Sequence, residues 1–228
     1  MAEPSVAVIV PLLNEIGMLP VMAEQWRRLA ADELLIVDGG STDGSLEYLQ
    51  GSGLRWLASG MGRAVQMNAG AAHSRSDIIV FIHADTSINS SRLSEVRQAF
   101  LDPETVAGRF DIRLEGKQPL LRVVERLINW RSRLTRISTG DQAMFVRRDV
   151  FERIGGFADQ PLMEDVELSK RLKREGRIAC LRQRVTTSGR RWEKQGAMRT
   201  ILLMWWLRLL YWLGVSPERL AAMYREVR

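Results

Sequence analysis

Leu34-Leu-Ile-Val-Asp-Gly-Gly-Ser-Thr-Asp-Gly44 is an apolar run that ends in a carboxylate and two glycines. The run predicts a buried β-strand, and the polar residues after it predict a turn at its carboxyl end. Glycines at this point let the backbone turn tightly and bring amide groups close to a ligand. The carboxylate of Asp38, followed by Gly39, can accept hydrogen bonds from a uracil or a ribose. A helix-capping turn with Ser41 or Thr42 as N-cap would explain the same residues.

Short apolar runs alternate with amphipathic stretches on both sides of this segment. The predicted strands are residues 6–10, 34–37, 54–57 and 78–82. The predicted helices are residues 15–29, a short stretch after residue 44, and residues 63–73, 119–134 and 162–175. Strand, helix and strand at this spacing are typical of βαβ units, so we expect an α/β fold with a mainly parallel central sheet flanked by helices. Beyond residue 112 the alternation loosens, and we expect helical segments separated by loops.

The composition is that of an ordinary globular protein. Of the 228 residues, 46% are hydrophobic and 26% are charged, which excludes disordered, collagenous and disulfide-scaffold proteins. The single cysteine, Cys180, allows neither an intramolecular disulfide nor a cysteine-based zinc site, which suits a reducing compartment. Residues 1–11 have no basic region and too short an apolar run for a signal peptide. We therefore expect a cytoplasmic protein.

Charge divides the chain into two halves. Residues 1–112 carry 8 basic and 14 acidic side chains, and residues 113–228 carry 25 and 13, so the net charges are −6 and +12. The basic half also holds five of the seven tryptophans. This pattern indicates an anionic partner, and a phosphorylated substrate, an anionic lipid surface and a nucleic acid all fit it.

Polar residues follow three of the predicted strands at their carboxyl ends. Pro11, Asn14 and Glu15 follow the first strand, Asp38 follows the second, and His83-Ala-Asp85 follows the fourth. In open sheets of this kind, ligands bind beyond the carboxyl ends of the strands. We therefore expect these residues to meet on one rim of the sheet.

Asp85 is the candidate metal ligand on this rim. A carboxylate at a strand end can hold Mg²⁺ or Mn²⁺ together with the oxygens of a diphosphate, whose departure requires that its charge is neutralised. Asp85 could instead cap the helix expected near Ser90, but its position on the rim favours the ligand role. His83, beside the strand end, could equally be a hydrogen-bonded structural residue.

A second acidic pair, Glu164-Asp165, opens a predicted helix. Acidic residues in a first turn stabilise the helix dipole, which accounts for one of the two. Asp165 could also act as a general base that deprotonates an acceptor hydroxyl, provided that it faces the rim. Arg63 and Asn68 are candidate contacts to a nucleotide diphosphate, and otherwise surface residues of their helix. The glycines near Arg63 match a dinucleotide fingerprint only in part, and a phosphate-loop motif is absent from the sequence.

Residues 201–213 form an apolar stretch that contains Trp205, Trp206 and Trp212. The stretch is too short, and too interrupted by Arg208, to span a membrane. It is similar to an interfacial helix that would contact anionic headgroups. A helix that packs in the core or forms a homodimer explains the same residues and is slightly favoured.

Four motifs in this order resemble the family 2 glycosyltransferases. They are Val-Pro-Leu-Leu-Asn-Glu at residues 10–15, Val-Asp-Gly-Gly-Ser-Thr-Asp-Gly at 37–44, His-Ala-Asp at 83–85 and Met-Glu-Asp at 163–165. The resemblance runs from about residue 5 to residue 192. It implies a GT-A fold and an inverting displacement that uses a nucleotide-diphosphate sugar and a divalent metal.

The resemblance also implies roles for residues of the rim. In that family the proline and the acidic residue after the first strand, and the aspartate after the second, hold the nucleotide, which implies this role for Pro11, Glu15 and Asp38. The family's Asp-x-Asp motif has His83 in place of its first aspartate here, so Asp85 keeps the metal role, while a contact of His83 with the ribose or the metal stays open.

The Glu-Asp motif implies that Asp165 is the catalytic base. The remaining candidate substrate contacts are Asn14, Gly39, Ala84, Asp141, Glu164, Arg191 and Trp192. Ser188 replaces the glutamine of the Gln-x-x-Arg-Trp motif of processive members, so we expect transfer of a single sugar. We expect the transferase domain to cover residues 1–195, and a tryptophan-rich helical extension to cover residues 196–228. Residues 1–112 would bind the nucleotide sugar, and residues 113–195 would face the acceptor.

A narrower resemblance is to small bacterial glycosyltransferases of the arsenosugar-biosynthesis type, which implies a small acceptor. It is carried by residues 62–70, 138–143, 161–168 and 187–192. The expected partners are the sugar donor and a small-molecule or lipid-linked acceptor, without nucleic acid. Peripheral contact with the inner face of a membrane and a homodimer both stay open.

Two rival functions also fit parts of the sequence. A nucleotidyltransferase would attack phosphorus and release pyrophosphate rather than a nucleoside diphosphate. A nonenzymatic binder of an anionic membrane or of nucleic acid would depend on salt but not on Asp85 or Asp165.

Overall fold

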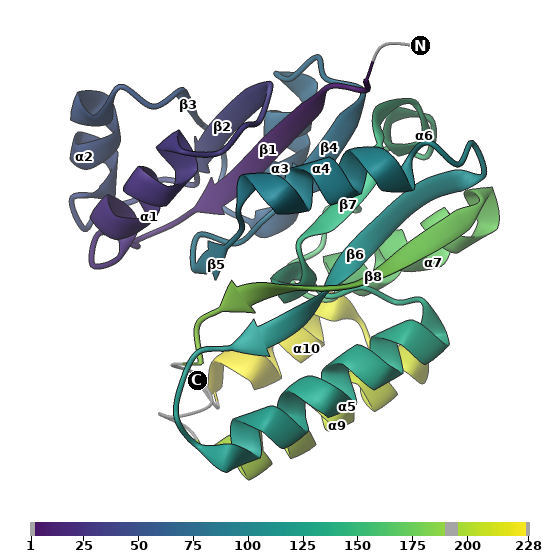
Figure 1. Cartoon of the computed structure of the whole chain (residues 1–228). Coiled ribbons are helices and arrows are strands. Elements are labelled where there is room, and N and C mark those ends of the chain that lie inside the picture. The colour runs from purple at the N-terminus through teal and green to yellow at the C-terminus, as the bar shows by residue number, and fades with distance from the viewer. Residues whose placement is uncertain (1–2, 190–195, 227–228) are drawn as a thin grey trace.

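The computed structural model describes residues 3–189 and 196–226 (Figure 1). The strands are β1 (Val6–Leu12), β2 (Glu33–Asp38), β3 (Trp56–Ala58), β4 (Ile78–Phe81), β5 (Thr86–Ser87), β6 (Thr105–Leu114), β7 (Met144–Arg147) and β8 (Arg177–Thr187). The helices are α1 (Leu19–Arg27), α2 (Ser45–Ser52), α3 (Arg63–Ala72), α4 (Ser90–Ala99), α5 (Pro119–Thr135), α6 (Arg148–Arg153), α7 (Glu164–Glu175), α9 (Ala197–Trp212) and α10 (Pro217–Glu226), with a 3-10 turn, η1, at Gly140–Gln142.

The strands form one eight-stranded sheet in the order β3-β2-β1-β4-β7-β6-β8-β5. β3, β2, β1 and β4 run parallel to one another. β7 is antiparallel to both β4 and β6, while β8 runs parallel to β6 and antiparallel to β5. The expected α/β fold with a mainly parallel sheet is therefore confirmed.

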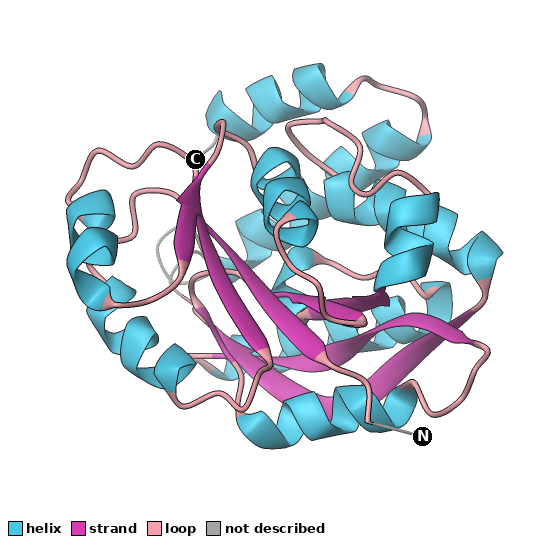
Figure 2. Ribbon diagram, turned by 90° about the horizontal axis from the view of Figure 1, so that it is seen from above, coloured by secondary structure: helices cyan, strands magenta, loops and turns pink. Residues whose placement is uncertain are grey.

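Apolar cores fill both faces of the sheet, which helices cover on each side (Figure 2). β1 and β4 are buried along their whole length, as expected for central strands covered on both faces. Side chains alternate along β1, so that Val8 and Val10 join the core that includes Leu19 of α1. Ile9 points to the other core, which includes Met67 of α3. This sandwich fixes the carboxyl ends of β1, β2 and β4 next to each other.

The second half of the chain contains strands that the sequence pattern did not predict. β7 has only four residues, and the apolar run of β8 is limited to residues 178–181 and is flanked by exposed arginines. Pairing with β4 and β6 makes these segments strands, and local composition does not encode such long-range contacts. Residue 112 lies inside β6, so the expected boundary between the two halves falls within a strand.

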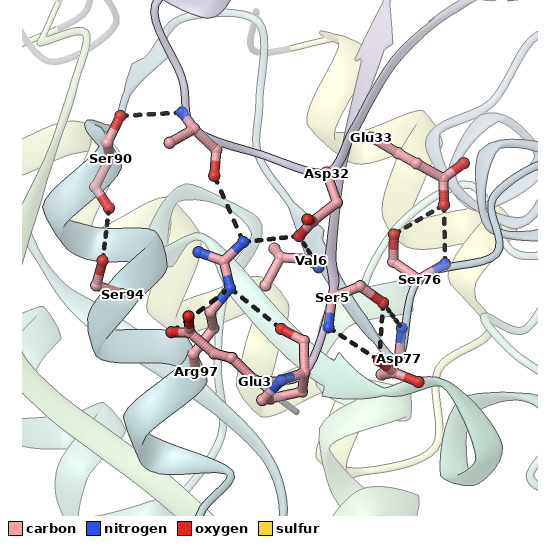
Figure 3. Close-up of polar contacts among 12 residues, drawn as sticks. Glu3, Ser5, Val6, Asp32, Glu33, Ser76, Asp77, Ser90, Ser94 and Arg97 are labelled. Carbon is pink, nitrogen blue, oxygen red and sulfur yellow. Dashed lines mark hydrogen bonds and ion pairs between the residues drawn. The ribbon is translucent and has the colours of Figure 1, made fainter. Parts of the chain in front are cut away.

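Side chains fasten the strands at their amino-terminal ends (Figure 3). Asp32 Oδ2 accepts a hydrogen bond from Val6 N–H at 2.7 Å and another from Arg97 Nη2 at 2.7 Å. Asp77 Oδ2 accepts from the N–H and the hydroxyl of Ser5 at 2.9 and 2.7 Å. These carboxylates precede β2 and β4, so they serve the structure at the end of the sheet opposite to the rim.

The two C-terminal helices pack on the part of the chain that begins α7. α9 contacts α5 and α10, and Figure 1 shows α5 and α9 running together. Leu207 of α9 and Leu220 of α10 are fully buried, and they cluster with Met163 and Val166. The extension therefore packs against the residues on either side of the acidic pair at the start of α7.

The tryptophans of α9 are largely exposed. Trp205, Trp206 and Trp212 are 59%, 51% and 76% exposed. Packing within this chain, one of the explanations expected from the sequence, thus buries Leu207 but leaves these three tryptophans largely exposed. In the part of the chain that the structure describes, no helix combines the length and the apolar character that crossing a membrane requires.

Candidate active site

The loops that follow β1 and β2 are tied to each other at the carboxyl ends of these strands. Asn14 N–H donates to Ser41 Oγ at 2.9 Å, and Asn14 Oδ1 accepts from Thr42 N–H at 2.8 Å. Glu15 N–H donates to Ser45 Oγ at 3.1 Å. Asn14 has a left-handed backbone with a φ of 54°, which asparagine tolerates better than most residues. Asn14 therefore joins the two loops, and its side-chain oxygen is already used within the protein.

Asp38 ends β2 beside this junction, and only one of its two carboxylate oxygens is hydrogen-bonded within the described part of the chain. Its Oδ2 accepts hydrogen bonds from the N–H groups of Gly40 and Ser41 at 2.9 and 3.0 Å. Its Oδ1 is buried and has no hydrogen-bond partner among residues 3–189 and 196–226. Because an unpaired buried acceptor costs free energy, this oxygen marks a place where a ligand would donate a hydrogen bond.

A cavity of about 790 Å³ opens at the rim and extends to α5, α9 and α10. The predicted residues that line it are Glu15, Arg63, His83, Asp85, Asp141, Glu164 and Asp165. The structure thus brings together the motifs after β1, after β4 and at the start of α7. The predicted residues outside this lining are Pro11, Asn14, Asp38, Gly39, Asn68 and Ala84. Arg191 and Trp192 lie outside the described residues.

Asp85 is positioned by a short bridge between β5 and β8. Thr86, the residue after Asp85, pairs with Thr187 at the end of β8. The hydroxyl of Thr86 donates to that of Thr187 at 3.3 Å, and the hydroxyl of Thr187 donates to Asp85 Oδ1 at 3.4 Å. A strand from the second half of the chain therefore holds the candidate metal ligand at the wall of the cavity.

Asp165 lies in the first turn of α7 and faces the same cavity. Its Oδ2 accepts from Gly140 N–H at 2.9 Å, and its Oδ1 accepts from Val166 N–H at 2.7 Å. Burial, together with the negative charges of Glu164 and Asp141, raises the pKa of Asp165 from 3.8 to about 7, although the two hydrogen bonds act in the opposite direction. A carboxylate with this pKa is suited to accept a proton near neutral pH.

Close contacts hold the backbone around Asp165. Gly140 lies against His83, because a Cβ on residue 140 would be 2.2 Å from His83 Nε2. Met163, two residues before Asp165, has a left-handed backbone with a φ of 66°. Such a conformation costs about 1–3 kcal/mol in a residue other than glycine. Met163 is buried in the same apolar cluster as Leu207, so the C-terminal extension supports the turn that presents Asp165.

The carboxylates fit a metal ion that binds together with a phosphorylated ligand. Among residues 3–189 and 196–226, no group of three or more His, Cys, Asp or Glu side chains could hold a metal ion. Asp85 can supply one oxygen ligand from the cavity wall, and diphosphate oxygens and water can supply the others, which is a usual arrangement for Mg²⁺. His83 lines the cavity two residues away.

Asn68 is used for packing. Its Nδ2 donates to Phe157 O at 2.8 Å, and its Oδ1 accepts from Phe157 N–H at 2.9 Å. Both amide atoms therefore attach the turn around Phe157 to α3, and nothing in this geometry favours the expected contact to a diphosphate. Pro11 is buried near the end of β1, and Ala84 is buried in the turn between β4 and β5.

Gln66 is a residue of this region that sequence reasoning missed. Its Nε2 donates to the carbonyl oxygens of Leu12 and Val37 at 2.7 and 2.8 Å. These two hydrogen bonds join the ends of β1 and β2 to α3. Gly39 leaves room for this side chain, since a Cβ on residue 39 would lie 2.9 Å from Gln66 Cδ. A glutamine among the buried residues of α3 is the signal that could have revealed this role.

Comparisons with known proteins agree with this geometry. Residues 7–155 match the family described as Glycosyl transferase family 2. No curated protein matches the chain. The chain is similar to the mannosyltransferase PcManGT from Pyrobaculum calidifontis in complex with GDP-Man and Mn²⁺, with a TM-score of 0.70 and 20% identity over 99% of this chain and 70% of that one.

The chain is also similar to residues 1–349 of TarS from S. aureus in complex with UDP-GlcNAc, with a TM-score of 0.61 and 16% identity over 81% of this chain and 58% of that one. The chain thus spans less than two thirds of that structure. At these identities the similarity concerns the fold, and it confirms the expected GT-A fold. Because the family match covers the rim and Asp85, and well over half of the chain, this protein belongs to glycosyl transferase family 2.

Proposed function

We propose that this glycosyltransferase moves a single sugar, with inversion, from a nucleoside-diphosphate donor to an acceptor hydroxyl, assisted by Mg²⁺ or Mn²⁺. The observation that carries the proposal is that Asp85 and Asp165, from the two halves of the chain, line one cavity beyond the strand ends. The family match supports the reaction class. The ligands of the two similar structures, GDP-Man with Mn²⁺ and UDP-GlcNAc, support a nucleotide-sugar donor.

The donor is proposed to bind along the rim of residues 1–112. The unpaired Oδ1 of Asp38 would accept a hydrogen bond from the base or the ribose. Glu15 and Arg63 line the cavity, where the guanidinium group can pair with the diphosphate. Asp85 would hold the divalent ion, which neutralises charge on the departing diphosphate.

Asp165 is proposed to act as the general base. It takes the proton from the acceptor hydroxyl, and the acceptor oxygen then forms its bond to the anomeric carbon. The bond from that carbon to the diphosphate oxygen breaks on the opposite face, and the nucleoside diphosphate leaves with the electron pair. A single displacement of this kind inverts the anomeric centre.

The first test is thermal unfolding with UDP, GDP, CDP and dTDP sugars, each with and without Mn²⁺. We expect one donor class to stabilise the wild type in a metal-dependent way, and Asp85→Asn to lose this effect. Product analysis then distinguishes a glycosyltransferase from a nucleotidyltransferase, because free nucleoside diphosphate indicates glycosyl transfer and pyrophosphate indicates nucleotidyl transfer. Failure of every donor to stabilise a folded sample would contradict the proposal and favour the nonenzymatic binder.

We also propose that the protein works in the cytoplasm, which its single cysteine suits. The exposed tryptophans of α9 and the positive charge of residues 113–228 support contact with an anionic membrane surface. A homodimer through the same helix is the competing proposal. The narrower arsenosugar-type resemblance, and the domain boundary at residue 195, stay predictions.

A further inference from the structure

The part of the cavity between α5 and α9 is apolar. Leu127 and Ile128 line it from α5, and Ile201, Met204 and Trp205 line it from α9. The aliphatic side chains in this lining offer no hydrogen-bond partners to the hydroxyl groups of a sugar or to the phosphates of a nucleotide. A hydrocarbon chain suits this lining, because its transfer from water to an apolar site is favourable.

Two arginines interrupt this apolar lining. Arg131 of α5 and Arg208 of α9 both line the cavity. The Nε and Nη2 atoms of Arg131 and the Nε atom of Arg208 are buried and have no hydrogen-bond partner in the described part of the chain. Buried N–H groups without acceptors are costly, so two such groups in one cavity indicate a ligand that supplies acceptors. A guanidinium group matches the paired oxygens of a phosphate or a carboxylate.

Arg131 also lies within electrostatic reach of the proposed base. Burial lowers the pKa of Arg131, the carboxylates of Asp141 and Asp165 act against this shift, and Arg109 adds to it. An oxyanion held at Arg131 would therefore offset positive charge close to Asp165. It would also bring the rest of its molecule to the place where the acceptor must react.

The position of these arginines assigns them to the acceptor. The rim that is proposed to hold the donor comes from residues 1–112, whereas both arginines come from helices of the second half. Their neighbours Leu127 and Met204 make a wall that suits neither a ribose nor a diphosphate.

We propose that the acceptor is an acidic amphiphile whose oxyanion binds Arg131 and Arg208 and whose hydrocarbon chain lies between α5 and α9. The inference rests on the proposed glycosyl transfer and names the acceptor class of the same site. The acceptor hydroxyl remains the nucleophile, and the oxyanion serves to orient the molecule.

Titration calorimetry with three probes tests the ligand class. The probes are dodecyl phosphate below its micelle concentration, the neutral amphiphile dodecyl maltoside, and inorganic phosphate. We expect dodecyl phosphate to bind at least about tenfold more tightly than either of the others, because only it satisfies both the arginines and the apolar wall. Equal binding of inorganic phosphate would exclude the hydrocarbon part, and equal binding of dodecyl maltoside would exclude the oxyanion part.

Variants test the two arginines. Arg131→Gln and Arg208→Gln should each weaken dodecyl phosphate by about tenfold or more and leave dodecyl maltoside unchanged. Arg126→Gln and Arg199→Gln, at exposed positions of the same two helices, are the matched controls and should bind like the wild type. If Arg131→Gln does not fold, Arg208→Gln and the ranking of the three probes on the wild type still test the proposed acceptor class.

Donor binding, measured on the same samples as Mn²⁺-dependent stabilisation by a sugar nucleotide, separates this inference from the proposed function. Variants that a sugar nucleotide still stabilises but that no longer bind dodecyl phosphate support the inference. Variants that lose the donor effect but keep dodecyl phosphate would assign both arginines to the diphosphate and overturn it. A wild type without any donor effect would overturn the proposed function, whatever the amphiphile does.

Discussion

The carboxyl group of Asp165 holds its proton more tightly in the folded chain than in the unfolded chain, because its pKa is about 7 rather than 3.8. Between these values the folded state keeps a proton that the unfolded state releases, so the free energy of unfolding falls as the pH rises from about 4 to about 7. Asp165→Asn has no carboxyl group at this position, so its free energy of unfolding should not fall in this way. We expect the Tm of the variant minus that of the wild type, measured in EDTA, to increase over this range by roughly 2–4 °C or more, the effect of about 1 kcal/mol in a chain of this size. A difference that stays flat would show that Asp165 is already ionised at acidic pH.

The proposed role of Asp165 as the general base predicts a pH dependence of catalysis. A general base works when deprotonated, so kcat/KM should rise with pH to a plateau above about 7, with an apparent pKa that belongs to Asp165 and Glu164 together. Asp165→Asn should lower kcat by about a hundredfold to ten-thousandfold and leave donor affinity within about twofold. Asp149→Asn, an exposed carboxylate on α6, is the control and should leave kcat unchanged. An Asp165→Asn enzyme with normal kcat would move the base to another residue.

Sequence reasoning reached the residues whose positions follow from local rules. Glu15 and Asp85 follow apolar strands, and parallel strands align their carboxyl ends, so a shared rim could be predicted. Arg131 could not, because it sits in the middle of a helix and only the packing of α9 beside α5 turns its surroundings into a cavity wall. The contacts of Asn68 with Phe157 could not be predicted for a related reason, since the turn that uses its amide lies 89 residues further along the chain.

At the scale of elements, η1 positions Asp165 through a glycine that leaves no room for a side chain. We expect Gly140→Ala to push His83 away and to lower both turnover and stability, the latter by about 1–3 kcal/mol as for other overpacked sites. Thermal unfolding and donor turnover measure the two effects. Gly51→Ala in α2 is the control, because a Cβ there meets nothing within 4 Å, and it should raise stability by roughly 0.5–1 kcal/mol. Normal turnover in Gly140→Ala would show that the contact with His83 is dispensable.

The hydrogen bonds at the amino-terminal ends of the strands should stabilise the fold without affecting the candidate active site. Asp77→Ala removes the acceptor for Ser5, and because the carboxylate is exposed we expect a loss of at most about 1 kcal/mol at neutral pH, seen as a lower Tm. The N–H and hydroxyl of Ser5 hold the pKa of Asp77 below 3.8. Its contribution is therefore complete above about pH 4 and disappears as the pH falls through the lower pKa of the folded state. Donor binding that fell together with Tm would contradict the separation of the two ends of the sheet.

The second half of the sheet shows where prediction from sequence stops. β1, β2 and β4 were predicted because each is a compact apolar run, but β7 has four residues and β8 carries exposed Arg182 and Arg184. These segments become strands because β7 pairs with β4 and β8 pairs with β6, and both partners lie far away in the chain. Periodicity over a short window contains no information about such partners.

At the scale of the whole molecule, the outward face of α9 concentrates apolar area on the basic half of the chain. We expect the protein to bind vesicles that contain phosphatidylglycerol, more weakly at high salt, and Trp206→Ser/Trp212→Ser to weaken this binding by about tenfold or more. Co-sedimentation with vesicles measures the effect. Leu101→Ser removes an apolar side chain that is 69% exposed on the acidic half, and it should have no effect. Absence of binding, with dimers in analytical ultracentrifugation that the double variant dissociates, would assign the face to a second copy of the chain.

The place of β5 beside β8 determines when the active site is completed during protein synthesis. Asp85 leaves the ribosome soon after β4, yet the strand that anchors it ends at Thr187. Because the chain emerges from its amino end, the strand ends around Asp38 leave the ribosome well before Thr187, whose hydroxyl contacts Asp85. Translation must therefore pass residue 187, long after the rim itself has emerged, before the growing polypeptide can become an enzyme.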